Sequence, residues 1–411
     1  MGKSMRIALI ADAYPPMRTS GALQLRDLSQ ELLRQGHFPS VLIPSPDLET
    51  PWSIEELHGV DVVRLKSPRT KDIGYAQRTV GEFIMPFMML RNLRKSPLAK
   101  VCWDGVVWYS PTIFLGPIVS VLKKASGCQS YLIIRDIFPE WAVDIGLLSR
   151  GLAYRFFKMI EHYQYSVADV IGVQTPGNVS YFDYWAKRNG QRVEVLQNWL
   201  TDAPDGECSI VVCDTHLASR KIFVYAGNMG VAQGMDILLD LAHALRSRED
   251  IGFLFVGRGS DTTRLQYDAM AQGLKNVVFY DEIDPSEIPG LYAQCHVGMV
   301  ALDPRHKTHN IPGKFLSYMQ SGLPVLATIN PGNDLETLIN TERVGRVSCD
   351  GSVVTLQKLA EELIDAISVD PEISSCCKAL STRLFNPEVA VKQIVTALQA
   401  KSETQVSKTN V

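Results

Sequence analysis

The chain lacks the short motifs that mark several common classes of enzyme. Its 411 residues contain neither a G-x-S-x-G nucleophile elbow nor a Walker loop, and the first predicted strand is not followed by G-x-G-x-x-G. The first two motifs carry serine-hydrolase and P-loop phosphoryl-transfer chemistry, and the third binds dinucleotides. The sequence therefore argues against these three classes.

Cysteine is present, but never in a ligand or redox pattern. The eight cysteines are scattered along the chain with no C-x-x-C spacing, and zinc sites and thiol redox centres usually need such spacing. Asp-x-Asp, the common carboxylate pair that holds a divalent metal in enzymes, is also missing. We therefore expect free thiols, no metal site, no cofactor and a cytoplasmic protein.

No strong excess of charge is found. The 41 basic and 44 acidic residues leave a formal net charge of −3, and hydrophobic residues make up 46% of the chain. These values are typical of a globular protein, and they favour neither disorder nor a nucleic-acid partner. Any anion-binding site must therefore be local.

Long hydrophobic runs are absent as well. The N-terminal apolar run, Ile7 to Ala11, is closed by Asp12 and is too short for the core of a signal peptide. The segment from Glu82 to Lys95 is interrupted by Pro86, and its apolar part falls far short of the roughly 20 residues that a membrane-spanning helix requires. We expect neither secretion nor membrane spanning.

The chain does contain a regular alternation of short apolar strands and helical patterns. In the first half the predicted strands are RIALIAD, PSVLIP, VDVVRL, GVVWYS, SYLIIRD and DVIGVQT, and in the second half they are KIFVYAG, GFLFVGR, NVVFYD, VGMVAL, LPVLAT and GRVSC. This alternation is typical of parallel sheets flanked by helices. The sequence therefore predicts an α/β protein with two Rossmann-like domains.

The predicted domain boundary lies in the polar segment from Thr201 to His216, which contains Pro and Gly and has no helical periodicity. We place the domains at residues 1–205 and 206–385. A further helical pattern at 386–400 follows the break at Phe385-Asn386-Pro387.

One stretch of the second half, His309 to Thr328, suits the binding of a phosphate. It reads as a Gly/Pro loop, then a short helix and a buried strand, with Lys314 at the start of the helix. Backbone N–H groups at such a helix N-terminus attract anions, and Lys314 adds a full positive charge. As a single motif it is also compatible with an ordinary helix start beside a surface lysine.

The same stretch has Pro-x-Lys, then Tyr-Met, then Gly-x-Pro-Val, and it resembles the donor-site loop of family-4 glycosyltransferases of the GT-B fold, as found in O-antigen and capsule pathways. The resemblance covers nearly the whole chain. It implies two Rossmann-like domains facing across a crevice, with the terminal helix crossing back to the first domain. It also implies metal-independent transfer with retention at the anomeric carbon.

The resemblance assigns a set of residues to the donor nucleotide sugar. In the Gly-rich turn after the first strand of the second half, Asn228 and Gln233 stand where the wider family has an Arg and a Lys, so we expect part of the neutralising charge to come from Lys314 and Arg258. The two donor-site glutamates of the family are replaced by Ser317 and a residue near His309. The predicted donor residues are Gly21, Gly227, Asn228, Gln233, Arg258, His309, Asn310, Gly313, Lys314 and Ser317.

The segment IIRDIFPEWAVDIG resembles the acceptor-side segment of the same family. Asp136 and Glu140 are the predicted catalytic residues, because a carboxylate can orient or deprotonate an acceptor hydroxyl. Arg135 stands where many relatives have a histidine. The alternative is that Asp136 caps a helix and Glu140 is solvated.

In detail the chain resembles L-fucosamine transferases, which implies transfer from UDP-N-acetyl-L-fucosamine to a lipid-linked saccharide. A UDP-N-acetylglucosamine 2-epimerase of the same fold and a non-catalytic sugar-nucleotide-binding protein are the alternatives. The apolar run beginning at Phe83 leads into Arg91, Arg94 and Lys95, a combination that favours contact with the anionic inner face of the membrane. The alternative is a core helix with a solvated basic end.

Overall fold

The computed structural model describes residues 3–17, 19–201, 206–230, 233–303, 305, 307 and 311–400, with no description of the side chains of residues 188 and 189. The chain forms two compact units. The first consists of Met1–Gln197 together with Pro387–Val411, and the second of Asn198–Asn386. The change of unit after Gln197 precedes the boundary expected at residue 205, which lies outside the described residues.

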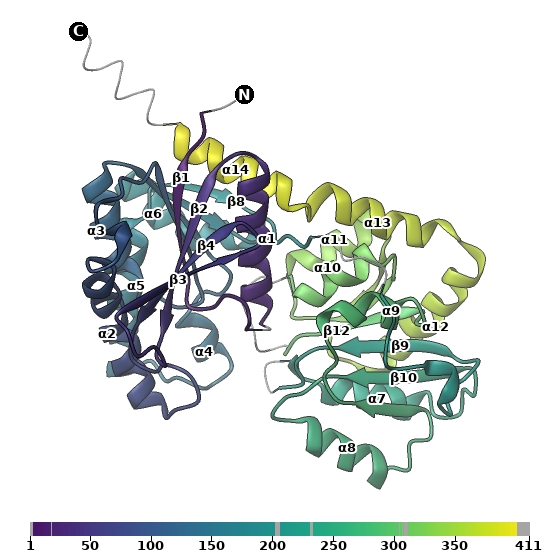
Figure 1. Cartoon of the computed structure of the whole chain (residues 1–411). Coiled ribbons are helices and arrows are strands. Elements are labelled where there is room, and N and C mark those ends of the chain that lie inside the picture. Colours follow the sequence, from purple (N-terminus) through teal and green to yellow (C-terminus); the bar gives the residue numbers. More distant parts are fainter. Residues whose placement is uncertain are drawn as a thin grey trace. The chain divides into compact units, whose positions relative to one another are not determined.

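The first unit is built on a sheet in the order β3-β4-β2-β1-β5-β6-β7-β8 (Figure 1). All neighbouring strands are parallel except β3, which runs antiparallel to β4. The strands are β1 (Arg6–Ile10), β2 (Phe38–Ser45), β3 (Trp52–Leu57), β4 (Val60–Lys66), β5 (Gly105–Tyr109), β6 (Gln129–Ile133), β7 (Val170–Val173) and β8 (Arg192–Val195).

The central strands of this sheet are buried on both faces because helices cover both. In β1 the residues from Ile7 to Ile10 are fully buried, and β5 is buried throughout, as expected for parallel strands between two helical layers. The helices are α1 (Ser20–Arg34), α2 (Tyr75–Leu93), α3 (Gly116–Ser126), α4 (Glu140–Asp144), α5 (Leu152–Val167), α6 (Asp183–Asn189) and α14 (Pro387–Gln399), with short 3₁₀ turns at Pro97–Lys100 and Pro176–Phe182.

Helix α14 belongs to the first unit although the second unit precedes it in the chain. Ile394 is fully buried, and Leu398 lies so close to β5 that a Cβ added at Gly105 would be 2.7 Å from its Cδ1. The Gln393 side chain donates to Glu194 Oε1 at 2.8 Å and to the Val195 carbonyl at 2.9 Å. These contacts make α14 part of the core of the first unit.

The second unit is a six-stranded, fully parallel sheet in the order β11-β10-β9-β12-β13-β14. Its strands are β9 (Lys221–Ala226), β10 (Ile251–Val256), β11 (Val277–Tyr280), β12 (Val297–Ala301), β13 (Val325–Thr328) and β14 (Gly345–Ser348). Its helices are α7 (Asp236–Ala244), α8 (Thr262–Ala271), α9 (Ile288–Tyr292), α10 (Gly313–Gln320), α11 (Asp334–Glu342), α12 (Val353–Val369) and α13 (Glu372–Leu384), with 3₁₀ turns at Val212–Asp214 and Pro285–Glu287.

Each sheet has a point where the strand order reverses. In the first unit β1 lies between β2 and β5, and in the second unit β9 lies between β10 and β12. The turns that leave two such neighbouring strands diverge, so the carboxyl edge of the sheet is open there, and open α/β sheets bind ligands at this place.

Candidate active site

The β9–α7 turn of the second unit leaves the sheet at its reversal point and packs tightly against the β10–α8 turn. Gly257 has φ +143°, and a Cβ there would lie 2.0 Å from the Gly227 carbonyl oxygen. The Met229 N–H donates to the Arg258 carbonyl at 2.8 Å, and the Gly227 N–H donates to the Val256 carbonyl at 2.9 Å. Glycine at 257 is therefore required for the two backbones to approach each other.

Lys314, the second residue of α10, places its side chain over this turn. A Cβ added at Gly227 would be 3.6 Å from Lys314 Cε and 4.0 Å from Nζ. The Nζ atom lies 2.6 Å from the Tyr225 hydroxyl and 3.8 Å from the centroid of its ring. Burial lowers the pKa of Lys314 to about 7, because a desolvated ammonium group is disfavoured. The structure thus brings Gly227 and Lys314 together.

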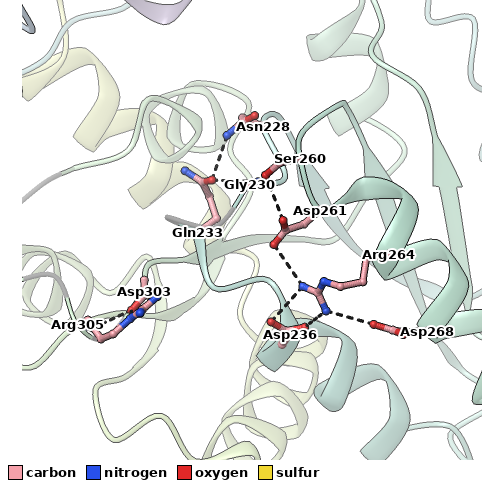
Figure 2. A network of polar contacts seen from close by, with 10 residues as sticks. All are labelled: Asn228, Gly230, Gln233, Asp236, Ser260, Asp261, Arg264, Asp268, Asp303 and Arg305. Carbon is pink, nitrogen blue, oxygen red and sulfur yellow. Dashed lines mark hydrogen bonds and ion pairs between the residues drawn. The ribbon is translucent and has the colours of Figure 1, made fainter. Parts of the chain in front are cut away.

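Asn228 and Gln233 make hydrogen bonds within the Gly-rich turn. Gln233 Oε1 accepts from Asn228 Nδ2 and from the Gly230 N–H, both at 3.1 Å (Figure 2). Asn228 itself is exposed. Neither side chain carries a charge. The hydrogen bonds of Gln233 shape the backbone of the turn, and the groups that can bind an anion are the backbone N–H groups and Lys314.

The beginnings of α7 and α8 are joined next to the turn by one arginine. Arg264 Nη1 lies 2.6 Å from Asp236 and 3.2 Å from Asp268, and Arg264 Nη2 lies 3.2 Å from Asp261 (Figure 2). Asp261 in turn donates its backbone N–H to the Met229 carbonyl at 3.0 Å. This network connects both helices to the turn that carries Gly227.

The other predicted donor residues of the second unit are Arg258, Gly313, Ser317, His309 and Asn310. The Arg258 guanidinium pairs with Glu282 at 2.8 Å and is largely exposed. Gly313 is the first residue of α10, and Ser317 Oγ makes a long bond of 3.4 Å to the Gly313 carbonyl. His309 and Asn310 lie outside the described residues.

In the first unit Gly21 and Arg135 lie near Tyr109, where β1 and β5 diverge. Gly21 is the second residue of α1, and a Cβ there would lie 3.3 Å from a ring carbon of Tyr109 at the end of β5. The Tyr109 hydroxyl donates to Gln24 at 2.6 Å, and the Arg135 guanidinium lies 5.9 Å from the centroid of the Tyr109 ring. Arg135 is buried and also donates to the Leu196 carbonyl at 3.1 Å.

Asp136 follows β6 and acts electrostatically on this cluster. Burial is the main cause that raises the pKa of Tyr109 to about 12; the positive charge of Arg135 opposes the rise, and Asp136 and Asp12 add to it. Asp12 follows β1, and its carboxylate lies 3.8 Å from Lys71. Asp136 is half-buried and follows the buried Arg135 at the carboxyl edge of the sheet.

Glu140 lies in a different environment from Asp136. It begins α4, accepts from the Tyr154 hydroxyl at 2.8 Å and pairs with Lys158 at 3.1 Å. Lys158 also pairs with Glu161, which is buried and whose pKa is raised chiefly by burial. Glu140 is therefore one carboxylate of an ion-pair network between α4 and α5.

Tyr225, Tyr109 and Asp303 are residues of these sites that the sequence analysis missed. Asp303, after β12, forms a two-point ion pair with Arg305 at 2.6 to 3.1 Å, and its Cα lies 3.3 Å from where a Cβ on Gly234 would be. Tyr109 is the last residue of β5 and Tyr225 is the last but one of β9, so their position near a strand's carboxyl end was the available signal. This position did not reveal which residues the two tyrosines contact.

Among the residues that the structure describes, no group of three or more His, Cys, Asp or Glu side chains could hold a metal ion. Within the same residues, no helix combines the length and the apolar character needed to cross a bilayer.

Two Rossmann-like units with open edges at these positions define the GT-B class of fold, which solved glycosyltransferases share with this chain. Residues 220–368 match the family model described as glycosyl transferases group 1, and the turn of Gly227 and the lysine of α10 lie within these matched residues.

Three proteins illustrate the similarity. The probable glycosyltransferase WbjE of Pseudomonas aeruginosa is 23% identical over 375 residues, which cover 88% of this chain and 90% of that protein. WcaI of Escherichia coli K12, which its name assigns to colanic acid biosynthesis as a glycosyl transferase, is 24% identical over 330 residues, covering 71% and 76%. The Anabaena protein HepE, solved with UDP and glucose, superposes with a TM-score of 0.65 at 15% identity, covering 96% and 100%.

Proposed function

We propose that the protein transfers a sugar from a UDP-sugar to a saccharide acceptor in the synthesis of a bacterial polysaccharide. The single observation that carries this proposal is the position of Lys314 over the Gly227 turn within the glycosyl transferases group 1 domain. The names of WbjE and WcaI and the UDP and glucose bound to HepE support the kind of reaction and the donor.

In the proposed reaction the donor diphosphate lies on the β9–α7 turn. The bond between the anomeric carbon and the diphosphate breaks, an acceptor oxygen forms the new bond on the same face of the sugar, and UDP leaves with the electron pair. Backbone N–H groups of the turn, the start of α10 and the Lys314 ammonium stabilise the charge that develops on the leaving group. The acceptor proton passes to a base.

Asp136 is our candidate for the group that orients the acceptor hydroxyl. It is half-buried at the carboxyl edge of the first sheet, and a carboxylate within hydrogen-bond reach suits this role. Glu140, the second predicted catalytic residue, is already engaged by Lys158 and Tyr154. We therefore assign Glu140 the support of the acceptor segment through this network.

The test of the proposal is Lys314→Ala, with Lys358→Ala as the matched control on the exposed face of α12. Loss of a charge-assisted contact to phosphate should lower transfer about ten- to a hundredfold, because such a contact contributes roughly 1.5–3 kcal/mol. Product formation is measured by release of UDP with acceptor present. Wild-type turnover by a folded Lys314→Ala protein would contradict the proposed site.

The donor sugar is proposed to be N-acetyl-L-fucosamine, with UDP-N-acetylglucosamine as the rival substrate of a 2-epimerase. A thermal-shift screen of UDP-sugars identifies the donor, since a ligand at 100 times its Kd stabilises the folded protein by about 2.7 kcal/mol. UDP release that requires acceptor supports a transferase. Conversion of the nucleotide sugar without acceptor would identify the epimerase, and binding with no product under any acceptor would indicate a non-catalytic protein.

Transfer is proposed to need no metal, because Lys314 and the backbone N–H groups can neutralise the diphosphate. Activity should persist in excess EDTA. Inactivation that magnesium or manganese reverses would refute metal independence.

The acceptor is proposed to be lipid-linked, and helix α2 supports this. Its apolar residues divide between two faces: Met85, Met89 and Leu90 are buried in the core. Val80, Phe83, Ile84 and Phe87 are between 41% and 59% exposed and follow a helical spacing that continues to the exposed Arg91 and Arg94. An apolar helix face leading into arginines suits an anionic membrane surface.

The membrane contact is tested with the triple variant Arg91→Gln, Arg94→Gln and Lys95→Gln. Each basic residue near an anionic surface contributes about 1 kcal/mol, so binding to phosphatidylglycerol vesicles should fall at least tenfold. The control removes three exposed basic residues from the second unit: Arg246→Gln, Lys275→Gln and Lys378→Gln. Equal vesicle binding by both variants, or no binding by the wild type, would rule out this surface.

A further inference from the structure

The Tyr225 side chain joins two parts of the candidate donor site. It is fully buried at the end of β9. Its hydroxyl donates to the Asn228 carbonyl at 2.7 Å and accepts from Lys314 Nζ at 2.6 Å. One oxygen atom therefore holds the backbone of the Gly-rich turn and the cation above it.

This arrangement restricts where Lys314 can go. A lysine side chain has four rotatable bonds and loses substantial conformational entropy when it is fixed. Here the stem passes beside Gly227, and the ammonium lies above the Tyr225 ring near its hydroxyl. Because the ring and the oxygen hold the side chain before any ligand arrives, less entropy is lost on binding.

We propose that Tyr225 is a positioning residue. Its hydroxyl aims Lys314 at the diphosphate of the donor, and the same hydroxyl also fixes the Asn228 backbone. The inference rests on the proposed function, since it presupposes that Lys314 meets a nucleotide diphosphate. It adds a residue that contacts the cation, and no direct contact between Tyr225 and the donor is needed.

The protonation of Lys314 provides a readout of this role. Burial is the cause of its low pKa. Two charged side chains on the flanking turns form ion pairs of their own, Arg258 with Glu282 and Arg305 with Asp303. Above pH 7 the free protein must take up a proton to present an ammonium to the diphosphate, so affinity falls as pH rises. The Tyr225 hydroxyl accepts a hydrogen bond from the ammonium form of Lys314 and so stabilises that form. Without this acceptor, the affinity for the diphosphate begins to fall at a lower pH.

The experiment measures the Kd of UDP-glucose by calorimetry from pH 6 to 9 for the wild type, Tyr225→Phe and Tyr318→Phe. Phenylalanine keeps the ring and removes only the hydroxyl. Tyr318 is the matched control, because it is equally buried in the same unit and its hydroxyl bonds to the carbonyls of Val224 and Met299, at 3.1 and 3.2 Å. Thermal unfolding of the free proteins checks that each variant is folded.

For Tyr225→Phe we expect a Kd about three- to tenfold higher than that of the wild type, which is the range for one lost hydrogen bond of ordinary strength, and a fall in affinity that begins at lower pH. Tyr318→Phe should keep the wild-type Kd and pH profile. In a Lys314→Met background Tyr225→Phe should raise the Kd less than it does in the wild-type background, because only the bond to the Asn228 carbonyl is then lost. A merely structural role would weaken both backgrounds equally.

The outcomes separate the two proposals. Wild-type affinity and pH profile in Tyr225→Phe, together with weak binding by Lys314→Met, would overturn the positioning role and leave the donor site intact. Equal weakening by Tyr225→Phe and Tyr318→Phe would also overturn it. Absence of binding of UDP-glucose, UDP-N-acetyl-L-fucosamine and UDP by the wild type at every pH would overturn the UDP-donor proposal and this inference with it.

Discussion

Two glycines that leave no room for a Cβ atom determine the shape of the β10–α8 turn. Gly257 combines a positive φ with a carbonyl oxygen 2.0 Å from where its Cβ would be, and Gly259 is similarly close to the Met229 carbonyl at 2.1 Å. The β10–α8 turn thus needs glycine at two positions for steric reasons. A side chain at either position must separate the turns, and any anion bound to their N–H groups would lose its contacts.

Gly257→Ala is predicted to destabilise the protein by roughly 1–3 kcal/mol, through strain at positive φ and overpacking, and to weaken UDP-glucose binding. Gly273→Ala is the control: it also has positive φ, at +64°, but nothing lies within 4 Å of its added Cβ. It should cost about 1 kcal/mol and leave binding unchanged. Urea unfolding and calorimetry measure both. Equal costs for the two variants would show that the close approach is unimportant.

Asp136→Asn is predicted to lower transfer while the Kd for the donor stays the same. The amide keeps the shape of the side chain and loses its ability to accept a proton. Steady-state kinetics with saturating donor and calorimetry with UDP-glucose separate the two effects. Loss of donor binding in a folded protein would place Asp136 in another role.

At this scale the sequence predicted Lys314, Gly227 and Asp136 as site residues, but it did not predict which residues lie beside them. Tyr225 lies in a strand that is buried on both faces. Apolar and polar residues do not alternate along such a strand, so the sequence does not show which face of the sheet Tyr225 occupies. Arg258 was predicted to supply part of the neutralising charge, and its guanidinium pairs with Glu282. That pair depends on β11 lying beside β10, which the local sequence does not specify.

At the scale of elements, helices α7 and α8 are coupled through Arg264. Three aspartates surround this arginine, and Figure 2 shows Asp261 between it and Ser260 at the turn. The carboxylates come from both helices, so the guanidinium neutralises charges that would otherwise repel one another. The beginning of each helix is held in place relative to the Gly-rich turn.

Arg264→Met is predicted to lower the free energy of unfolding by about 0.5–1.5 kcal/mol, the range for a partly exposed network of charges. The loss should shrink in 1 M NaCl, because salt screens the repulsion among the remaining carboxylates. Arg246→Met, which loses only a bond to the His243 carbonyl at 2.8 Å, should be close to neutral. A salt-independent loss would show that packing of the arginine stem, not charge, is responsible.

The strands themselves were largely predictable. All twelve predicted apolar runs contain strands of the structure, because buried parallel strands are short continuous apolar segments. Strands β3 and β8 were not predicted. In β3 exposed and half-buried residues alternate at the sheet edge, and β8 has only four residues, none of them fully buried. Edge strands of this kind carry too little apolar sequence to stand out.

At the scale of the whole molecule, the two units differ in how the chain builds them. The second unit is one continuous segment, Asn198–Asn386, whereas the first requires α14 from beyond it. The sequence predicted a separate helix at 386–400. Only the resemblance to a family suggested where it would pack, because a periodic apolar face shows that a helix is covered but not by which sheet.

Ile394→Ala is predicted to destabilise the first unit by about 2–5 kcal/mol, the usual cost of truncating a fully buried isoleucine. Val389→Ala is the control on the same helix, since Val389 is 50% exposed, and it should cost less than about 0.5 kcal/mol. Hydrogen exchange measured for each unit separately locates the effect. Loss of protection in β9 to β14 but not in β1 to β8 would contradict the assignment of α14.

The place of α14 in the chain also sets an order of events during translation. The ribosome delivers every residue of the second unit before it delivers the helix that completes the first, so the nascent first unit waits with the surface under α14 exposed while the second unit can already close. Domains generally fold as they emerge, and exposed apolar surface invites aggregation or chaperone binding during such a delay. The residues synthesised first are thus among the last to reach their final environment.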